Sequence, residues 1–317
     1  MSSTNRSGNP RRILRLVIQW TIPIAIVTAF VFTGHLGEAL SALAGVSLIW
    51  AFPLVCIGVA LPLSHAWRWC FLLKRTGAEI SLAASTRITA LASLINYAAP
   101  GFLGAPAKAI LARDGHAVPL SRSLPTLAVE QILDALLLAL GGTIAVLIAG
   151  PAIIDAGVAL LNVEQSARVI IVVLVAAALL IALWVGVRRF LPGFAGALRT
   201  ATSALLHSRV HLRPIGALTL TRWVLDMLAV GVASIAVGLR LSLIEVLLLA
   251  NLSLLVGLVA PVPGGLGVRE GMMAAIAGVI GASIPAVLAL SVLHRAGLAI
   301  GLPIVLGAAK LREWSAG

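Results

Sequence analysis

The residues of this sequence best suited to chemistry are ionisable side chains inside long apolar runs. Such residues are costly to bury in a membrane, and they commonly mark a binding site or a proton path. Glu130 and Asp134 are four residues apart, so they share one helix face, and each needs a cation or a proton. Arg222 and Asp226 have the same spacing and opposite charges, which predicts an ion pair near the cytoplasmic end of a helix.

A second candidate group follows the glycine- and proline-rich segment 261–271, which reads PVPGGLGVREG. Proline and glycine break helices, so this segment predicts a new helix that starts just after Gly267. Arg269 then lies in the first turn, where free N–H groups and a partial positive charge attract anions. Arginine also binds phosphate through two parallel hydrogen bonds. We therefore expect a phosphate receptor at Arg269, and different partners for the adjacent Glu270.

These residues predict a substrate-binding site, with no catalytic residues, no metal site and no cofactor. The predicted members are Arg269, Glu270, Arg295, Glu130, Asp134, Lys108, Gly264, Gly265, Gly267, Pro100 and Gly104. We expect Arg269 and Arg295 to meet Glu130, Asp134 or a lipid phosphate. His65, Trp67, Arg68 and Trp69 are instead interpreted as an interfacial belt.

The composition places these residues in an all-α integral membrane protein. Hydrophobic residues make up 60% of the 317 positions and charged residues only 11%, whereas a soluble domain is roughly a quarter charged. The net charge of +12 could indicate a nucleic-acid-binding protein. The basic residues lie at the ends of apolar runs, however, as the positive-inside rule predicts, so we exclude a nucleic-acid partner.

Apolar runs of about 20 residues predict about six full spans in a single domain, 1–317. The expected spans are Leu16–Thr33, Leu43–Leu63, Leu124–Ile148, Val169–Val187, Pro214–Gly238 and Ile284–Ala309. The first is interpreted as a retained helix rather than a signal peptide. Two longer runs, Leu82–Ala112 and Ser242–Gly281, contain proline and glycine breaks and predict paired or re-entrant helices.

Lysine and arginine set the expected orientation. The expected location is the inner or plasma membrane of the cell. If the N-terminus lies in the cytoplasm, eighteen cationic residues fall on the internal side. Two fall on the external side, Arg168 and Arg240. Both termini are therefore expected in the cytoplasm.

The two broken runs share the pattern P-G-x-L-G, at Pro100–Gly104 and again at Pro263–Gly267, 163 residues later. With the expected orientation the first run enters from the cytoplasm and the second from outside. Two inverted halves, 1–157 and 158–317, joined by the loop Gly150–Ala167, would give this pattern. Inverted repeats with broken helices are typical of transporters, whose sites lie near the bilayer midplane. Two ordinary proline kinks are the alternative.

Segment 261–271, the downstream Arg295 and the element Glu130–Asp134 resemble the lysylphosphatidylglycerol synthase transmembrane-region family. The resemblance covers nearly the whole chain and implies a flippase-like protein. Gln131 stands where the family usually has arginine. The first break also departs from the family pattern Pro-x-Arg-x-Gly-Glu-x-x-Arg, since Phe102 and Ala105 replace its first Arg and its Glu, and Lys108 its last Arg. These departures put the headgroup of the substrate in doubt.

The resemblance and the residues favour translocation of a phospholipid or another lipid-linked amphiphile, by a protein that is not an enzyme. The expected partner is a membrane lipid with an anionic headgroup or phosphate. Two alternatives stay open: a non-catalytic membrane partner of a lipid- or glycan-modifying enzyme, and a small-solute secondary transporter.

Overall fold

The computed structural model describes residues 30–98, 103–159, 212–260 and 262–315, together with residues 24, 28 and 203. Within this part of the chain there are helices and turns but no β-strand. The elements are α2 (His35–Ala44), the short 3₁₀ helix η1 (Leu48–Trp50), α3 (Ala51–Arg75), α4 (Leu82–Ala98), α5 (Gly104–His116), α6 (Leu120–Ala159), α9 (Arg213–Ala236), α10 (Leu243–Val259), α11 (Val268–Ile280) and α12 (Ile284–Ser315). The predicted all-α fold of a polytopic membrane protein is confirmed.

Four of the described helices are long and apolar enough to cross a membrane: α3, α6 over Leu120–Ala149, α9, and α12 over Ile284–Lys310. The last three coincide with predicted spans, and α9 begins with a proline in its first turn, where the missing N–H costs nothing. The predicted span Val169–Val187 and most of Leu16–Thr33 lie outside the described residues.

The prediction of a span at Leu43–Leu63 is wrong in its bounds. Helix α2 ends at Ala44, a turn and η1 follow, and the membrane helix α3 runs over Ala51–Arg75. The polar residues from His65 onward suggested the end of a span, yet they continue the helix because Arg68 is neutralised inside the protein. The expected loop Gly150–Ala167 is also helical as far as Ala159, where α6 ends.

Each broken run forms two shorter helices, as predicted. Helices α4 and α5 flank the first break, and α10 and α11 flank the second. Helix α10 begins with a capping box, in which Ser242 and Glu245 each accept the other's backbone N–H. Helix α11 starts directly after Gly267, as expected from the sequence.

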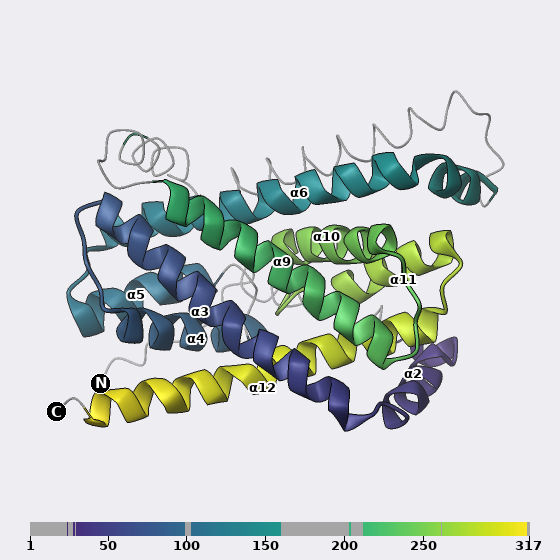
Figure 1. The fold of residues 1–317 in the computed structure, drawn as a ribbon, viewed down its shortest axis with the longest axis horizontal. Helices are drawn as coiled ribbons and strands as arrows, with labels where there is room; N and C mark the ends of the chain where they lie inside the picture. The colour runs from purple at the N-terminus through teal and green to yellow at the C-terminus, as the bar shows by residue number, and fades with distance from the viewer. Residues whose placement is uncertain are drawn as a thin grey trace, which may run out of the picture.

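The helices of the two parts of the chain run in opposite directions. In Figure 1, α3 rises from lower right to upper left while α9 descends, and α6 and α12 bound opposite edges of the molecule in opposite senses. A shift of 163 residues carries the first residues of α3, α4, α5 and α6 to positions 214, 245, 267 and 283. These positions lie within two residues of the starts of α9, α10, α11 and α12. Helix α6 packs on α10, and α12 packs on α4.

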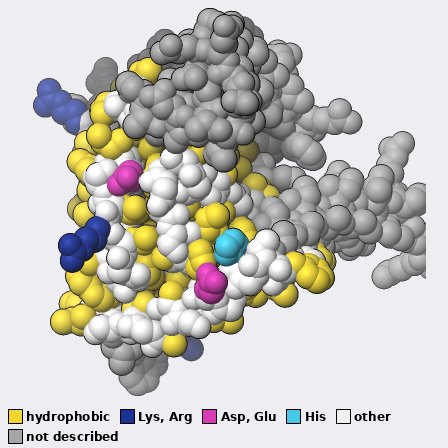
Figure 2. Space-filling view, turned by 90° about the vertical axis from the view of Figure 1, so that its right-hand side faces the viewer, with side chains coloured by type: hydrophobic (Ala, Val, Ile, Leu, Met, Phe, Trp, Pro, Cys, Tyr) yellow, Lys and Arg dark blue, Asp and Glu magenta, His cyan; other side chains and the backbone are white. Residues whose placement is uncertain are grey.

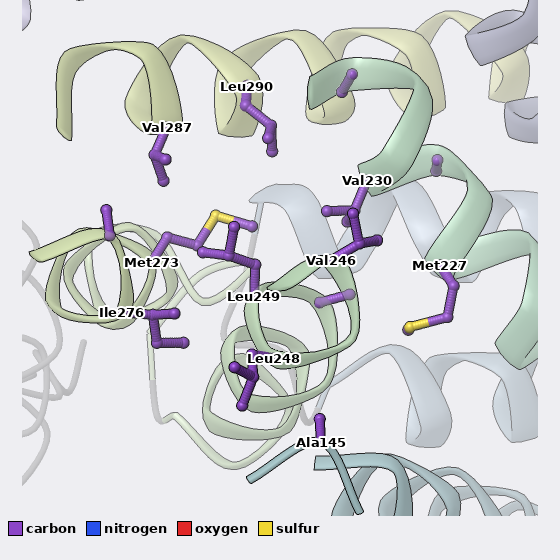
Figure 3. Packing of buried hydrophobic residues seen from close by; sticks show 14 of the residues in the cluster. Ala145, Met227, Val230, Val246, Leu248, Leu249, Met273, Ile276, Val287 and Leu290 are labelled. Atoms are coloured by element: carbon purple, nitrogen blue, oxygen red, sulfur yellow. The ribbon is translucent and has the colours of Figure 1, made fainter. Parts of the chain in front are cut away.

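The largest cluster of buried apolar residues in the described part of the chain centres on α9, α10, α11 and α12 and includes residues of α3 and α6. Figure 3 shows Met273 of α11 beside Val287 and Leu290 of α12, with Val230 of α9 and Leu249 of α10 completing the contact. Lipid is as apolar as these side chains, so close packing rather than water exclusion stabilises the contact. This packing fixes the α11 face against α12, and that juxtaposition positions the charged residues of both helices.

The two ends of the bundle differ in charge. The carboxyl end of α3 and the amino ends of α6 and α9 lie on the left in Figure 1, and they carry Lys74, Arg75, Arg122 and Arg213. Figure 2 looks onto the opposite end, where the described surface shows scattered charged side chains among apolar ones. The basic end is the one that the sequence assigns to the cytoplasm.

Candidate functional site

A buried ion-pair network, here called the paired cluster, joins α3, α5, α6 and α9. It consists of Arg68, Lys108, Glu130, Asp134, Arg222 and Asp226. Arg68 lies at its centre: its Nη1 and Nη2 donate to the two carboxylate oxygens of Asp134 at 2.6 and 3.0 Å, and its Nε donates to Glu130 at 3.3 Å. Arg68 is only 1% exposed, so its bidentate contact with Asp134 is shielded from solvent.

Lys108 neutralises the other side of Glu130. Its Nζ donates to Glu130 Oε2 at 3.0 Å and lies 4.3 Å from the centre of the Trp69 ring. Trp69 is fully buried and donates its indole N–H to Thr126 at 3.0 Å. Lys108 is therefore held by a carboxylate and by an aromatic face, which attracts cations.

Arg222 bridges two carboxylates. Its Nη1 lies 3.0 Å from Asp134, and its Nη2 lies 3.5 Å from Asp226, one turn further along α9. The predicted pairing of Arg222 with Asp226 is confirmed, as is the expectation that Glu130 and Asp134 each need a cation. Three cations meet three carboxylates, so the paired cluster has no net charge.

The interpretation of Arg68 and Trp69 as interfacial belt residues is wrong. Both are buried, and only Trp67 of that group is exposed to half of its surface. Sequence reasoning also missed His294, the residue that precedes Arg295 in α12. The signal that could have found Arg68 was the need of two membrane carboxylates for counter-ions, since Arg68 follows closely on the apolar run Leu43–Leu63.

A second group, here called the turn cluster, lies where the glycine turn meets α11 and α12. It consists of Arg269, Glu270, Ser291, His294 and Arg295. Gly264, Gly265 and Gly267 all have positive φ, so the turn depends on residues without a side chain. A Cβ at Gly265 would lie only 2.9 Å from the Gly257 Cα of α10, and this close approach anchors the turn.

Glu270 ties the start of α11 to α12. Its Oε2 accepts the Gly267 N–H at 2.7 Å, and its Oε1 accepts from Ser291 at 2.8 Å and from Arg295 Nε at 2.9 Å. Arg295 also donates from Nη1 to the Gly264 carbonyl at 2.8 Å. The Glu270 carboxylate therefore caps the N-terminus of α11. The sequence by itself predicts a substrate anion at this position.

Arg269 faces a different partner, as expected for a residue adjacent to Glu270. Its Nη2 lies 3.2 Å from His294 Nδ1. Since arginine only donates hydrogen bonds, His294 accepts through Nδ1 and carries its proton on Nε2. Arg269 is 6% exposed and His294 is fully buried, and no described carboxylate lies within 4 Å of Arg269.

Three buried nitrogens of the turn cluster have no hydrogen-bond partner among the described residues. They are Arg269 Nε, His294 Nε2 and Arg295 Nη2. A buried N–H group without an acceptor costs about 1–3 kcal/mol. Three such groups on neighbouring side chains make this the place in the described structure best prepared to receive an acceptor from outside.

The expectation that Arg269 and Arg295 meet Glu130 or Asp134 is wrong. Those carboxylates pair with Arg68, Lys108 and Arg222, while Arg295 pairs with Glu270. The predicted site residues thus divide between two groups: Glu130, Asp134 and Lys108 lie in the paired cluster, and Arg269, Glu270, Arg295, Gly264, Gly265 and Gly267 lie in or beside the turn cluster.

The two broken regions approach each other in space. A Cβ at Gly264 would lie 3.6 Å from the Asn96 carbonyl oxygen and 3.8 Å from the Tyr97 Cα, at the end of α4. The Asn96 side chain accepts the Gly104 N–H at 2.7 Å, so it caps the start of α5. Gly104 is therefore a structural position beside the turn cluster, and Pro100 lies outside the described residues.

A cavity of about 420 Å³ lies between α6 and α9. Its lining is apolar, from residues such as Leu72, Leu133 and Leu136, apart from Thr219, whose hydroxyl accepts from Arg68 at 3.2 Å. Arg269 and Arg295 do not line this cavity. The cavity therefore borders the paired cluster and not the turn cluster.

One protein family matches nearly the whole chain. The model of the lysylphosphatidylglycerol synthase TM region matches residues 13–307. The chain belongs to this family. A search of curated proteins finds no match. The matched range contains the paired cluster, the glycine turn and the turn cluster, and membership indicates a membrane protein related to lipid handling.

Proposed function

We propose that this protein translocates a phospholipid or another lipid-linked amphiphile across the membrane and that it binds the anionic headgroup at the turn cluster. The observation that carries the proposal is the burial of Arg269 without a described counter-ion. This cation is buried without a described carboxylate partner, beside two further nitrogens that lack acceptors. A membrane protein has little reason to keep such a costly arrangement unless an anion fills it.

The helix arrangement supports transport rather than catalysis. The first residues of α3–α6 match those of α9–α12 to within two residues at a shift of 163, and α3 and α6 run in the opposite sense to α9 and α12 (Figure 1). In this proposal the two halves form an inverted repeat with two re-entrant hairpins. The close approach of Gly264 to the end of α4 supports a headgroup site where the two hairpins meet. The protein acts on the position of the lipid and makes or breaks no covalent bond.

The charged helix ends support the proposed topology. The ends that carry Lys74, Arg122 and Arg213 gather on one side of the bundle, and this side faces the cytoplasm of a cell with an inner or plasma membrane. Both termini are cytoplasmic in this arrangement. The partner of the protein is a membrane lipid rather than a nucleic acid.

The test is lipid exchange in reconstituted vesicles. Purified protein is placed in liposomes that contain fluorescent lipids with anionic, zwitterionic or neutral headgroups, and a membrane-impermeant reductant bleaches the outer leaflet. We expect the wild type to accelerate exchange of an anionic lipid at least tenfold over empty vesicles, and Arg269→Gln to abolish the acceleration. Lys74→Gln, at an exposed lysine, serves as the control and should behave as the wild type.

The amount and folding of each variant are checked by gel filtration and circular dichroism before reconstitution. A folded and fully active Arg269→Gln protein would contradict the proposed headgroup site. If the wild type exchanges no lipid, with or without an ion gradient, translocation itself is refuted, and a membrane partner of a lipid-modifying enzyme or a small-solute transporter becomes the better reading.

A further inference from the structure

The buried charges of the two clusters do not cancel. The paired cluster is neutral, with Arg68, Lys108 and Arg222 against three carboxylates. The turn cluster has two arginines and only Glu270 to neutralise them, while His294 accepts from Arg269 and is therefore neutral. The two clusters together thus carry one excess positive charge.

The three nitrogens without a described partner belong to the two arginines of the turn cluster and to the histidine that contacts one of them. Arg269 Nε, His294 Nε2 and Arg295 Nη2 come from adjacent helices that are packed by the α11–α12 core (Figure 3). A phosphodiester has two non-bridging oxygens that share one negative charge, and each oxygen accepts more than one hydrogen bond. Three donors and one net charge therefore match this group in number and in sign.

We propose that the turn cluster selects a singly charged phosphodiester headgroup over a doubly charged phosphomonoester or an uncharged lipid. This inference rests on the proposed function, and it names the class of substrate. A monoanion brings the two clusters to neutrality, whereas a dianion leaves one uncompensated buried negative charge, which disfavours its binding. An uncharged lipid leaves the cation and the three donors as they are.

Asp226 gives a way to change the charge balance without removing a donor. It is 4% exposed, and its Oδ2 accepts no hydrogen bond from the described residues, although it lies 3.5 Å from Arg222. It interacts electrostatically with Arg269 of the turn cluster. Asp226→Asn keeps the shape of the side chain and raises the net charge of the two clusters by one, so the preferred headgroup should shift toward a dianion.

The experiment compares three lipids with identical dioctanoyl chains: phosphatidylmethanol, phosphatidic acid and diacylglycerol. Phosphatidylmethanol differs from phosphatidic acid only by a methyl ester that removes one charge. Binding to the purified full-length protein in a neutral maltoside detergent is measured by calorimetry at an alkaline pH, at which phosphatidic acid carries two negative charges. Octanoate is added as a carboxylate monoanion to separate phosphodiester recognition from charge alone.

We expect the wild type to bind phosphatidylmethanol at least tenfold more tightly than phosphatidic acid, octanoate or diacylglycerol. Arg269→Gln should lose about tenfold of the phosphatidylmethanol affinity. Asp226→Asn should shift the ratio of the two phosphate lipids about tenfold toward phosphatidic acid. Asp114→Asn, which removes an exposed carboxylate and changes the total charge equally, is the matched control and should keep the wild-type ratio.

Equal binding of phosphatidylmethanol and phosphatidic acid by the wild type overturns the inference, and this comparison needs no variant to fold. An unchanged ratio in folded Asp226→Asn overturns it as well, as does equally tight binding of octanoate. If vesicles show lipid exchange while the headgroups are not distinguished, this inference fails and the proposed function stands. If no lipid binds and none is exchanged, both fail together.

Discussion

The paired cluster and the turn cluster contain the same kinds of side chain, but their charges are balanced in the first and unbalanced in the second. In the paired cluster each carboxylate has at least one cation, and Arg68 alone makes contacts to Glu130, Asp134 and Thr219. In the turn cluster the buried Arg269 contacts the neutral His294 and no described carboxylate. The paired cluster balances its charges within the protein, whereas the turn cluster has one unbalanced positive charge and three nitrogens without a described acceptor. A buried charge is thus informative about ligands only after its partners are known.

The largest expected effect is the loss of the central cation of the paired cluster. Arg68→Met removes the two-pronged partner of Asp134 and one partner of Glu130, and it leaves an excess of buried negative charge. Breaking a buried ion pair on one side costs about 3–5 kcal/mol. We expect a marked fall of the thermal unfolding midpoint in detergent.

Lys74→Met is the control for this change, because Lys74 is an exposed lysine at the end of the same helix. Its unfolding midpoint should match that of the wild type. If Arg68→Met is as stable as the control, the paired cluster does not hold α3, α6 and α9 together, and the contrast between the clusters is lost.

A smaller loss is expected in the turn cluster from a change in the backbone rather than in a charge. Gly265→Ala introduces a Cβ that meets Gly257 at 2.9 Å, at a residue with φ of +67°. A side chain at such a φ costs about 1–3 kcal/mol. Because the same turn presents the Gly264 carbonyl to Arg295, lipid exchange should fall together with the unfolding midpoint.

Gly278→Ala is the matched control, since Gly278 lies in α11 with open space around its Cα and no positive φ. This change should keep or slightly raise stability, because alanine favours a helix over glycine by up to about 1 kcal/mol. Equal behaviour of the two variants would show that the turn tolerates a side chain.

A still smaller effect is expected from the hydroxyl that supports Glu270. Ser291→Ala removes one hydrogen bond to Oε1, while Arg295 and the Gly267 N–H continue to hold the carboxylate. The loss should be about 0.5–1.5 kcal/mol, visible as a modest shift of the urea or thermal transition. Exchange activity should be largely kept, and its complete loss would assign Ser291 a role in binding.

The smallest effect on stability is expected for Arg269→Met, in direct contrast to Arg68→Met. Loss of the contact to His294 is offset by removal of a buried cation that has no described carboxylate. The free energy of unfolding should change by less than about 1 kcal/mol, and the thermal midpoint should shift correspondingly little. A drop as large as that of Arg68→Met would place both arginines in the same structural role.

The sequence by itself determined the class of the protein and most of its helices. Long apolar runs, broken by proline and glycine, gave the spans near Arg213–Ala236 and Ile284–Ser315 and the start of α11 after Gly267. These features follow from local chemistry: length, hydropathy and the backbone freedom of glycine. Helical spacing likewise predicted the pairing of Arg222 with Asp226, because four residues make one turn.

Only the tertiary structure decided which charges on different helices meet. Arg68 was assigned to an interfacial belt because a lone arginine in an aromatic context is usually found there, and its carboxylates are 62 and 66 residues away. Helices distant in sequence meet where their surfaces pack closely, as α3 and α12 do at Gly58 and Gly297, where no side chain intervenes. Hydropathy and spacing carry no information on such pairings. They could therefore name Arg269 as a candidate, but its lack of a partner became visible only in the folded chain.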